Sequence, residues 1–563
     1  MDPARAAPWT AHQQRYREAF HADVAADTLK PLVFPWSFVG SFFLPLAYLN
    51  IPHVHRPWLF HLRWAVSAAV VAFNIDLAQT TSSGNEAVAY ATGLLAVWGS
   101  IWALRLLIFT RPQWDAARVV RRPKKQKAVS ENPQLTPATA PDESVAAALP
   151  QSEYIWQPFP ATAPLLTRLA WTADLLTAWR GAGWNFAIST IPHPPRPPQH
   201  LLHSGSPLPV RLDLIPPSPA RSTTYAAFLR SRLTQFALSY ITIDILTCTM
   251  RSNPYFVYGP DHFAPSRTLA DDFTPRVLFR DLKQNLPAFA GILAGLHLYA
   301  SALQLLVVFP LRRVVGVKAE LWMHPTLFGG FWGPVGTREV AGFWGVWWHQ
   351  TFRAGFVAPG EWIASFFKGA EGVASGEARR NEVGNGQSNL GVNEAAKESN
   401  ETTTPTPTPT PDAPRRPLLL RALTTTIPFL LSGLLHAAGS FTSAPSATYT
   451  RPTWPVGSFY FFALQPVQIL VWYLMLGNIL TGGSQRILSV LSTARFLASQ
   501  GSFLIDDMSR ASIWLFEPVP VSPLRMVGLG PFGEGWWRWG GGEYGLSWYS
   551  GGGGRWWEAG VRF

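Results

Sequence analysis

Charged residues are scarce in this chain of 563 residues. They make up 14% of it, whereas a soluble globular domain contains about 25%. Hydrophobic residues make up 47%, and the mean hydropathy is only +0.07 because polar, proline-rich stretches separate strongly apolar ones. So little charge argues against a soluble globular protein. The 26 tryptophans are typical of segments that are anchored at a membrane interface.

Cysteine is almost absent, since Cys248 is the single one. Its isolation excludes an intrachain disulfide framework and a cysteine-based zinc site, and it argues against a thiol nucleophile. The paired histidine boxes of iron-dependent membrane desaturases are missing, as are the motifs GxSxG, GxxxxGKS/T and HxxxD. His200 and His203 form an HLLH pair, but the prolines around them favour an irregular loop. We therefore expect no metal site and no serine nucleophile.

The chain contains seven long apolar stretches. Each comes close to the roughly 20 residues that a helix needs to cross a bilayer. They are residues 32–51, 59–79, 88–109, 228–248, 287–309, 418–441 and 456–480. Residues 340–366 are interrupted by glycine and charge, which favours a re-entrant or interfacial helix. The expected fold is an all-α polytopic membrane protein with roughly seven to nine transmembrane helices.

Basic residues cluster beside the predicted spans. The run Arg118–Lys127 follows the third span, Arg312, Arg313 and Lys318 follow the fifth, and Arg415 and Arg416 precede the sixth. By the positive-inside rule these clusters lie on the cytosolic side, so the net charge of +12 reflects topology. Anionic lipid headgroups are the expected partner, and nucleic acid is not.

Composition divides the chain further. Residues 1–31 are polar and lack the features of a signal peptide, and the insert 369–417 is of low complexity. The expected segments are 1–31, polar; 32–110, N-terminal membrane helices; 111–164, a basic, disordered cytosolic loop; 165–368 and 418–481, the two parts of the core; 369–417, a disordered insert; and 482–563, a Gly/Trp-rich C-terminal segment that we expect at the membrane interface.

One histidine, His436, lies deep inside the apolar stretch 418–441. An ionisable residue at such a depth is costly and marks a candidate site. On a helix, its neighbours at i−4, i−3, i+3 and i+4 are Ser432, Gly433, Gly439 and Ser440. Such a strip without bulk permits two interpretations. It provides either close packing against another helix or a groove in which a substrate reaches the imidazole.

A second histidine, His349, stands in the aromatic stretch FWGVWWHQTFR, residues 343–353. If this stretch is helical, His349 shares a face with Gly345 and Arg353. An interfacial aromatic belt with a polar tip is the simpler interpretation. The alternative is that His349 and His436 meet in one site.

Several motifs together resemble those of the membrane-bound O-acyltransferases, in particular the wax synthase-like branch of plants and fungi. The resemblance rests on FWGVWWHQTFR, on SGLLH at Ser432–His436 and on RGAGWNF at Arg180–Phe186. NPYF at Asn253–Phe256 and FFALQ at Phe461–Gln465 add to it, and the matches follow one another in order between about residues 165 and 480.

The resemblance implies an acyltransferase of the endoplasmic reticulum that moves an acyl group from acyl-CoA, its co-substrate, to the hydroxyl of a long-chain alcohol, sterol or terpenoid. No bound cofactor is expected. His436 would be the general base and His349 an orienting or second active-site group. Predicted substrate-binding residues are Trp348, Arg353, Ser432, Gly433 and Gln465. Arg353 and Arg338 are the candidates to hold the phosphates of CoA, and Trp472 stands where an acidic residue is expected.

Direct attack of the alcohol on the thioester is the expected mechanism, because the sequence presents no activated serine or cysteine. A rival hypothesis is a membrane transporter or a non-catalytic scaffold in which the two histidines bind a proton or a ligand, or only pack helices. Many transporters contain internal repeats, and we find none in this sequence.

Overall fold

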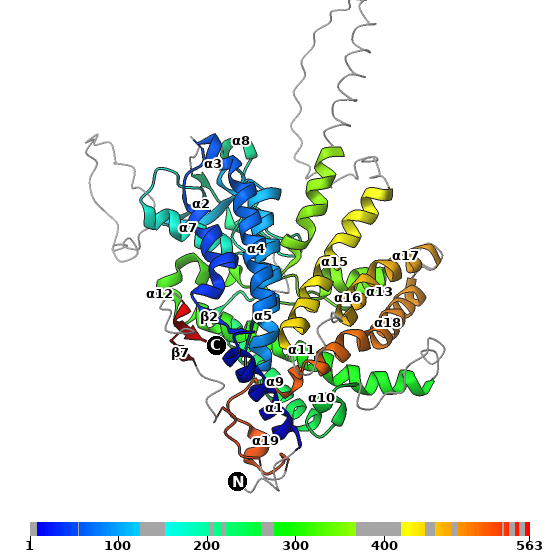
Figure 1. The fold of residues 1–563 in the computed structure, drawn as a ribbon. Coiled ribbons are helices and arrows are strands. Elements are labelled where there is room, and N and C mark those ends of the chain that lie inside the picture. The colour runs from blue at the N-terminus through cyan, green and yellow to red at the C-terminus, as the bar shows by residue number, and fades with distance from the viewer. Residues whose placement is uncertain are drawn as a thin grey trace, which may run out of the picture.

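Figure 1 shows the computed structural model, which describes residues 8–54, 56–123, 152–202, 207–215, 221–260, 275–367, 418–444, 456–475, 482–531, 534–539, 546–550 and 558–563. Helices dominate, and among the described residues six are long and apolar enough to cross a membrane. These are Pro57–Thr80, Glu86–Phe109, Tyr225–Met250, Leu282–Val308, Leu419–Ser443 and Gly457–Met475. The prediction of a predominantly helical, multi-pass membrane fold is confirmed. The predicted insert 369–417 lies outside the described residues.

The spans map onto named helices. They are α3 with α4 (Pro57–His61 and Arg63–Thr80), α5 with a following π-helical turn (Glu86–Leu104 and Arg105–Phe109), α9 (Tyr225–Met250), α11 (Pro275–Val308), α15 (Leu418–Ser443), and α16 with α17 (Val456–Ala463 and Gln465–Met475). The other helices are α1 (Pro8–Ala25), α2 (Leu44–Asn50), α6 (Pro112–Asp115), α7 (Leu165–Thr177), α8 (Gln199–Leu202), α10 (Pro254–Tyr258), α12 (Arg312–Val315), α13 (Trp332–Gly342), α18 (Gly482–Arg510) and α19 (Pro523–Met526).

The predicted span 32–51 is not a single helix. Pro35 has no N–H and holds Phe34 in an extended conformation, so a helix does not run through this point. The chain forms two short strands instead, β1 (Lys30–Pro31) and β2 (Val33–Phe34), before it reaches α2. β1 pairs with β3 (Thr81–Ser82), and β2 with β8 (Gly560–Arg562), which also pairs with β7 (Ser547–Tyr549). The described residues therefore contain six candidate spans rather than the predicted seven to nine.

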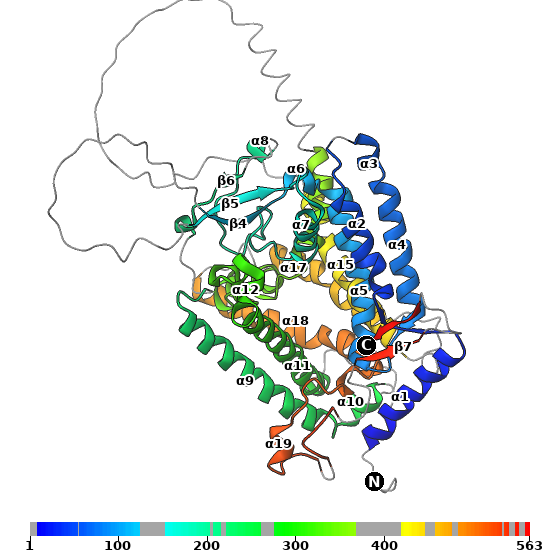
Figure 2. The same ribbon diagram turned by 90° about the vertical axis from the view of Figure 1, so that its left-hand side faces the viewer.

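A small antiparallel sheet corrects the prediction of a disordered loop over residues 111–164. Its strands are β4 (Ala117–Pro123), β5 (Ser152–Pro158) and β6 (Leu208–Pro209). Figure 2 shows this sheet beside α6 and α7 at one end of the molecule. The prediction fails at both ends of the loop because strand pairing is a non-local interaction, which the polar composition of the intervening residues did not reveal. Residues 124–151 are outside the described part.

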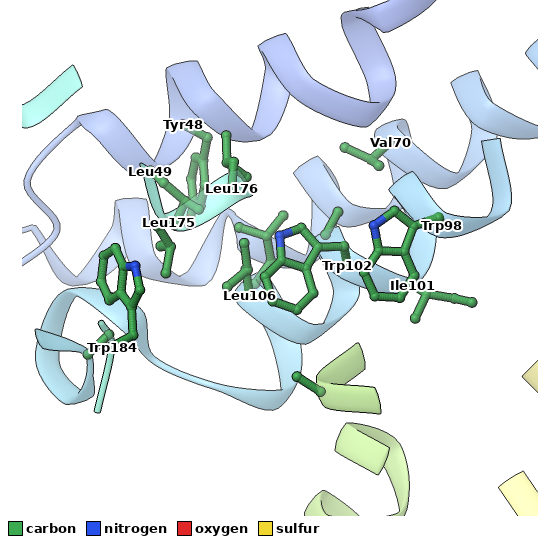
Figure 3. Close-up of a cluster of buried hydrophobic side chains, with 14 of the residues drawn as sticks. Tyr48, Leu49, Val70, Trp98, Ile101, Trp102, Leu106, Leu175, Leu176 and Trp184 are labelled. Atoms are coloured by element: carbon green, nitrogen blue, oxygen red, sulfur yellow. The ribbon is translucent and has the colours of Figure 1, made fainter. Parts of the chain in front are cut away.

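Aromatic side chains fill the core between α2, α5 and α7 (Figure 3). Trp184, from the RGAGWNF motif, is buried there against Trp171, and its Nε1 donates to Asp174 at 3.2 Å. The motif turns sharply, with Gly181 and Gly183 at φ values of +66° and +76°, a conformation that favours glycine. Its role in this fold is to fasten a loop to the core.

The C-terminal segment is packed more closely than an interfacial segment would be. α18 lies against α11, α13 and α16. Beyond it, Ser522 and Arg525 contact the buried Asp244 of α9 at 2.5 and 3.3 Å. The carboxylate therefore joins the C-terminal segment to a membrane helix, where a buried charge without a partner would be strongly destabilising.

The closest helix packing in the centre joins α5 to α15. A Cβ atom at Gly93 would collide with the backbone of Ala438, and one at Gly439 would lie 2.8 Å from the ring of Tyr90. Thr442 completes the contact, since its hydroxyl donates to the carbonyl of Ala89 at 2.7 Å. Small residues are used in this way where membrane helices approach each other closely.

This packing predicts that two glycine substitutions differ in their effect on stability. Gly93→Ala is expected to destabilise the protein by about 1–3 kcal/mol, because the added methyl group meets backbone that cannot yield. Gly295→Ala is the matched control, since nothing lies within 4 Å of the Cβ that it adds to α11. Thermal unfolding in detergent micelles measures both. Equal melting temperatures for the two variants would contradict the described packing.

Candidate active site

A cavity of about 330 Å³ lies between α13, α15, α17 and the aromatic stretch 343–353. His349 and His436 both line it. The two histidines are thus brought together from segments on either side of the long insert. Most of the wall is apolar, and Trp344, Phe352 and Phe462 contribute aromatic rings. Such a cavity suits an apolar ligand that is oriented by a few polar groups.

Two contacts hold the ring of His436. Its Nδ1 lies 2.8 Å from the hydroxyl of Tyr90 on α5, and its face stacks on Phe462 at 4.9 Å with an interplanar angle of 11°. Tyr90 and His436 are 346 positions apart in the sequence, and sequence reasoning did not identify Tyr90. A single tyrosine in an apolar helix gave no signal for such a pairing.

Hydroxyl groups continue from Tyr90 away from the cavity. Ser440 hydrogen-bonds to Tyr90, and its Oγ lies 3.3 Å from that of Ser458. The backbone N–H of Ser458 then donates to Asp507 at 2.6 Å. If the Tyr90 hydroxyl donates to Ser440, its oxygen can accept a hydrogen bond from the Nδ1–H group of His436. In that tautomer, Nε2 of His436 is the atom that can accept a proton.

His349 follows a π-helical turn, Phe343–Trp347, and not a regular helix as we had considered. The backbone becomes extended at Trp348, with ψ at 152°, and Gln350 donates to the carbonyls of Trp344 and Trp348 at 2.8 and 2.7 Å. This turn places the imidazole between Phe328 and Phe352, and its buried Nδ1 has no hydrogen-bond partner.

Burial lowers the pKa of His349, and together with the neighbouring His436 and Arg180 it brings the pKa to about 3. The imidazole is therefore neutral at pH 7. In this form it carries no charge, and it can donate one hydrogen bond to a ligand and accept one from it.

Three of the five predicted substrate-binding residues line the cavity: Trp348, Arg353 and Ser432. The guanidinium of Arg353, however, donates to the carbonyl of Gly345 and to Oε1 of Gln350. These hydrogen bonds hold Arg353 to the turn that carries His349. Arg338, the other residue predicted to hold phosphate, is exposed and does not line the cavity.

Gly433 and Gln465 lie behind the cavity wall. A Cβ at Gly433 would lie 3.0 Å from the carbonyl oxygen of Phe459, so this residue serves helix packing. Gln465 is buried and accepts a hydrogen bond from Nε1 of Trp344 at 2.8 Å, which orients a ring that does line the cavity. Trp472 is buried as well and is not part of the wall.

Within the described part of the chain, no group of three or more His, Cys, Asp or Glu side chains is placed to hold a metal ion. His203 of the HLLH pair is outside that part.

Comparisons with known proteins match part of this chain. A model of the membrane bound O-acyl transferase family matches residues 324–379, which include His349. Over this segment the chain is therefore similar to the membrane-bound O-acyltransferases. An O-mevalon transferase of Aspergillus niger is 24% identical over 285 residues, which are 49% of this chain and 47% of the relative. The chain thus spans about half the length of that relative. No solved structure matches it.

The lowered pKa of His349 predicts a pH-dependent stability. Because its folded-state pKa of about 3 lies below the ordinary value of 6.5, the unfolded chain binds this proton more readily between the two values. The stability that the neutral ring contributes is fully present above pH 6.5 and is lost as the pH falls towards 3, by at most about 1.4 kcal/mol per pH unit.

We therefore expect the melting temperature of His349→Gln to fall less steeply with acid than that of the wild type. His200→Gln, which removes an exposed imidazole, is the control and is expected to follow the wild type. Parallel pH profiles for all three proteins would show that His349 is not held neutral by the fold.

Proposed function

We propose that this protein transfers an acyl group from acyl-CoA to the hydroxyl of a hydrophobic acceptor, with His436 as the general base. The observation that carries the proposal is the placement of His436. It faces an apolar cavity, and Nδ1 on the other side of its ring is engaged by Tyr90. The family match and the transferase relative support acyl transfer as the reaction class.

The chemistry follows from the weak acidity of an alcohol. Nε2 of His436 takes the hydroxyl proton while the acceptor oxygen forms a bond to the thioester carbonyl carbon. The carbon–sulfur bond then breaks, and the imidazolium returns the proton to the departing thiolate. Proton transfer of this kind contributes on the order of a hundred- to ten-thousandfold in rate. The apolar wall keeps water, the competing nucleophile, away from the thioester.

His349 is proposed to orient a reactant. Its neutral ring shares the cavity with His436. Its N–H would donate to the thioester carbonyl, or its unprotonated nitrogen would accept from the hydroxyl of the acceptor. Trp348 and Ser432 would contact the substrates directly, whereas Gln465 and Arg353 would act through Trp344 and the turn around residue 350.

The acceptor is proposed to be a long-chain alcohol, a sterol or a terpenoid-type secondary metabolite, in keeping with the wax synthase-like motifs. The name of the relative from Aspergillus niger specifies a mevalon group, so the acyl groups tested should include short, polar ones as well as long chains. We propose the endoplasmic reticulum as the location.

Replacing His436 tests the proposal most directly. His436→Gln is expected to reduce ester formation by at least about a hundredfold, because the group that takes the hydroxyl proton is lost. Microsomes from a host without this activity would be incubated with radiolabelled acyl-CoA and a panel of alcohols. His297→Gln is the matched control, since His297 is also a histidine of a membrane span but does not line the cavity. Unchanged transfer by His436→Gln would remove this residue from the mechanism.

Tyr90 is proposed to select the tautomer of His436. Tyr90→Phe is expected to lower kcat about fivefold with little change in KM, because a hydrogen bond of about 1 kcal/mol to the base is lost while the cavity keeps its shape. It should also displace the pH profile of kcat. A variant with unchanged kcat and pH profile would restrict Tyr90 to a packing role.

A further inference from the structure

A second cavity, of about 840 Å³, lies where the β4–β5 sheet meets the start of α9 and the α12 region. Three arginines from distant parts of the chain line it: Arg121, Arg221 and Arg312. Among the described residues of its wall, Glu320 is the single acid. Its carboxylate already accepts hydrogen bonds from Tyr154 at 2.8 Å and from Trp322 at 2.8 Å. The wall therefore carries a positive charge in excess.

Arg221 has unused hydrogen-bonding capacity. Its Nη2 donates to the carbonyl of Pro192, while Nε and Nη1 are buried and have no partner among the residues that the structure describes. Both ring nitrogens of the adjacent His193 are buried without a partner as well. Burial lowers the pKa of His193, and together with the charges of Arg221, Arg196 and Arg180 it brings the pKa to about 3. Two nitrogen atoms of Arg221 are thus buried, whereas Arg121 and Arg312 are exposed at the cavity. Positive charge gathered in this way without an equal number of acidic partners favours an anionic ligand.

Aromatic rings and hydroxyl groups complete the cavity. Tyr154, Tyr225 and Trp322 offer flat faces, and the guanidinium of Arg312 lies 4.6 Å from the centre of the Tyr225 ring. Guanidinium groups recognise phosphates through charge-assisted hydrogen bonds, and aromatic faces stack on nucleobases. The combination fits a phosphorylated nucleotide better than a simple inorganic anion.

A continuous segment joins the two cavities. Trp322 lines the second cavity, and six residues later Phe328 contacts the ring of His349. Between them, the carbonyl of Thr326 accepts a hydrogen bond from Arg180 at 3.1 Å. Arg121 and Arg312 belong to the basic clusters that the positive-inside rule places on the cytosolic side. Both also line this cavity, a convergence that the rule alone does not require.

We propose that this second cavity binds the phosphorylated nucleotide end of the acyl donor. The proposal rests on the proposed function for the identity of the donor. It takes the place of Arg353 and Arg338, whose positions make them unsuited to holding phosphate.

The test is a binding measurement on the full-length protein in detergent micelles. The probe is 3′,5′-ADP, which has the adenosine, the 3′-phosphate and one of the two 5′-phosphates of CoA but no thiol or acyl chain. We expect Arg221→Gln and Arg312→Gln each to weaken its affinity at least about tenfold, since a charge-assisted hydrogen bond is removed. Arg312 is exposed, so its variant is expected to fold even if the variant of the buried Arg221 does not.

Arg122→Gln is the matched control. Arg122 neighbours Arg121 on β4 but does not line the cavity, and it is paired with Glu153 at 2.7 Å. It removes the same charge and is expected to bind 3′,5′-ADP within about twofold of the wild type, because an exposed ion pair contributes little. Equal weakening in all three variants would indicate only a long-range charge effect and would overturn the site.

Two further arms separate the alternatives. Vesicles containing phosphatidylinositol 4-phosphate test a lipid headgroup as the source of the phosphate. Binding of these vesicles that depends on Arg221 and Arg312, without binding of 3′,5′-ADP, would overturn the nucleotide assignment. Because the assay needs no turnover, nucleotide binding by a chain that acylates no alcohol would keep the site and reject the proposed function. Acyl transfer with an unchanged KM for acyl-CoA in both variants would keep the proposed function and reject the nucleotide site.

Discussion

The close contact between α5 and α15 is the constraint on which the candidate active site depends. Lipid provides little hydrophobic force to drive two membrane helices together, so their association relies on van der Waals contact and hydrogen bonds. Gly93 and Gly439 remove the side chains that would keep the helices apart. Only at this separation does Tyr90 reach Nδ1 of His436. A structural contact and a candidate catalytic contact are therefore the same contact.

The strip of small residues around His436 serves both purposes that its composition allowed. Ser432 lines the cavity, whereas Gly433 and Gly439 pack against Phe459 and Tyr90. The division follows the direction in which each residue points from α15. One side of the imidazole is left open to a ligand, and the other side is held in place. A base that is fixed on one side and accessible on the other needs little reorganisation during proton transfer.

Two charged side chains inside the protein differ in whether they have partners. Asp244 in α9 is satisfied by Ser522 and Arg525, so the C-terminal segment compensates a carboxylate that would otherwise be buried alone. Arg221, in contrast, retains buried nitrogen atoms without partners beside a cavity of excess positive charge. The first arrangement stabilises the fold. The second leaves positive charge at a cavity, where an anionic ligand would compensate it.

Local composition accounts for what was predictable. The stretches 88–109 and 418–441 became α5 and α15 because apolarity over some 20 residues is a property of the segment itself. The choice of His349 and His436 rested on another local anomaly, an ionisable ring in apolar surroundings, and both rings line one cavity. The proline at position 35 was visible too, yet the apolar length of 32–51 outweighed it in the prediction.

Tertiary structure decided which residues meet. The pairing of β4 with β5, the contact of Tyr90 with His436 and the convergence of Arg121, Arg221 and Arg312 each join segments that are far apart in the chain. No single segment carries a signal for such proximity, since it arises only when helices and strands pack. The hydrophobicity of a segment is a local property and can be predicted from its sequence. The geometry of a site depends on distances between segments, which only the folded structure fixes.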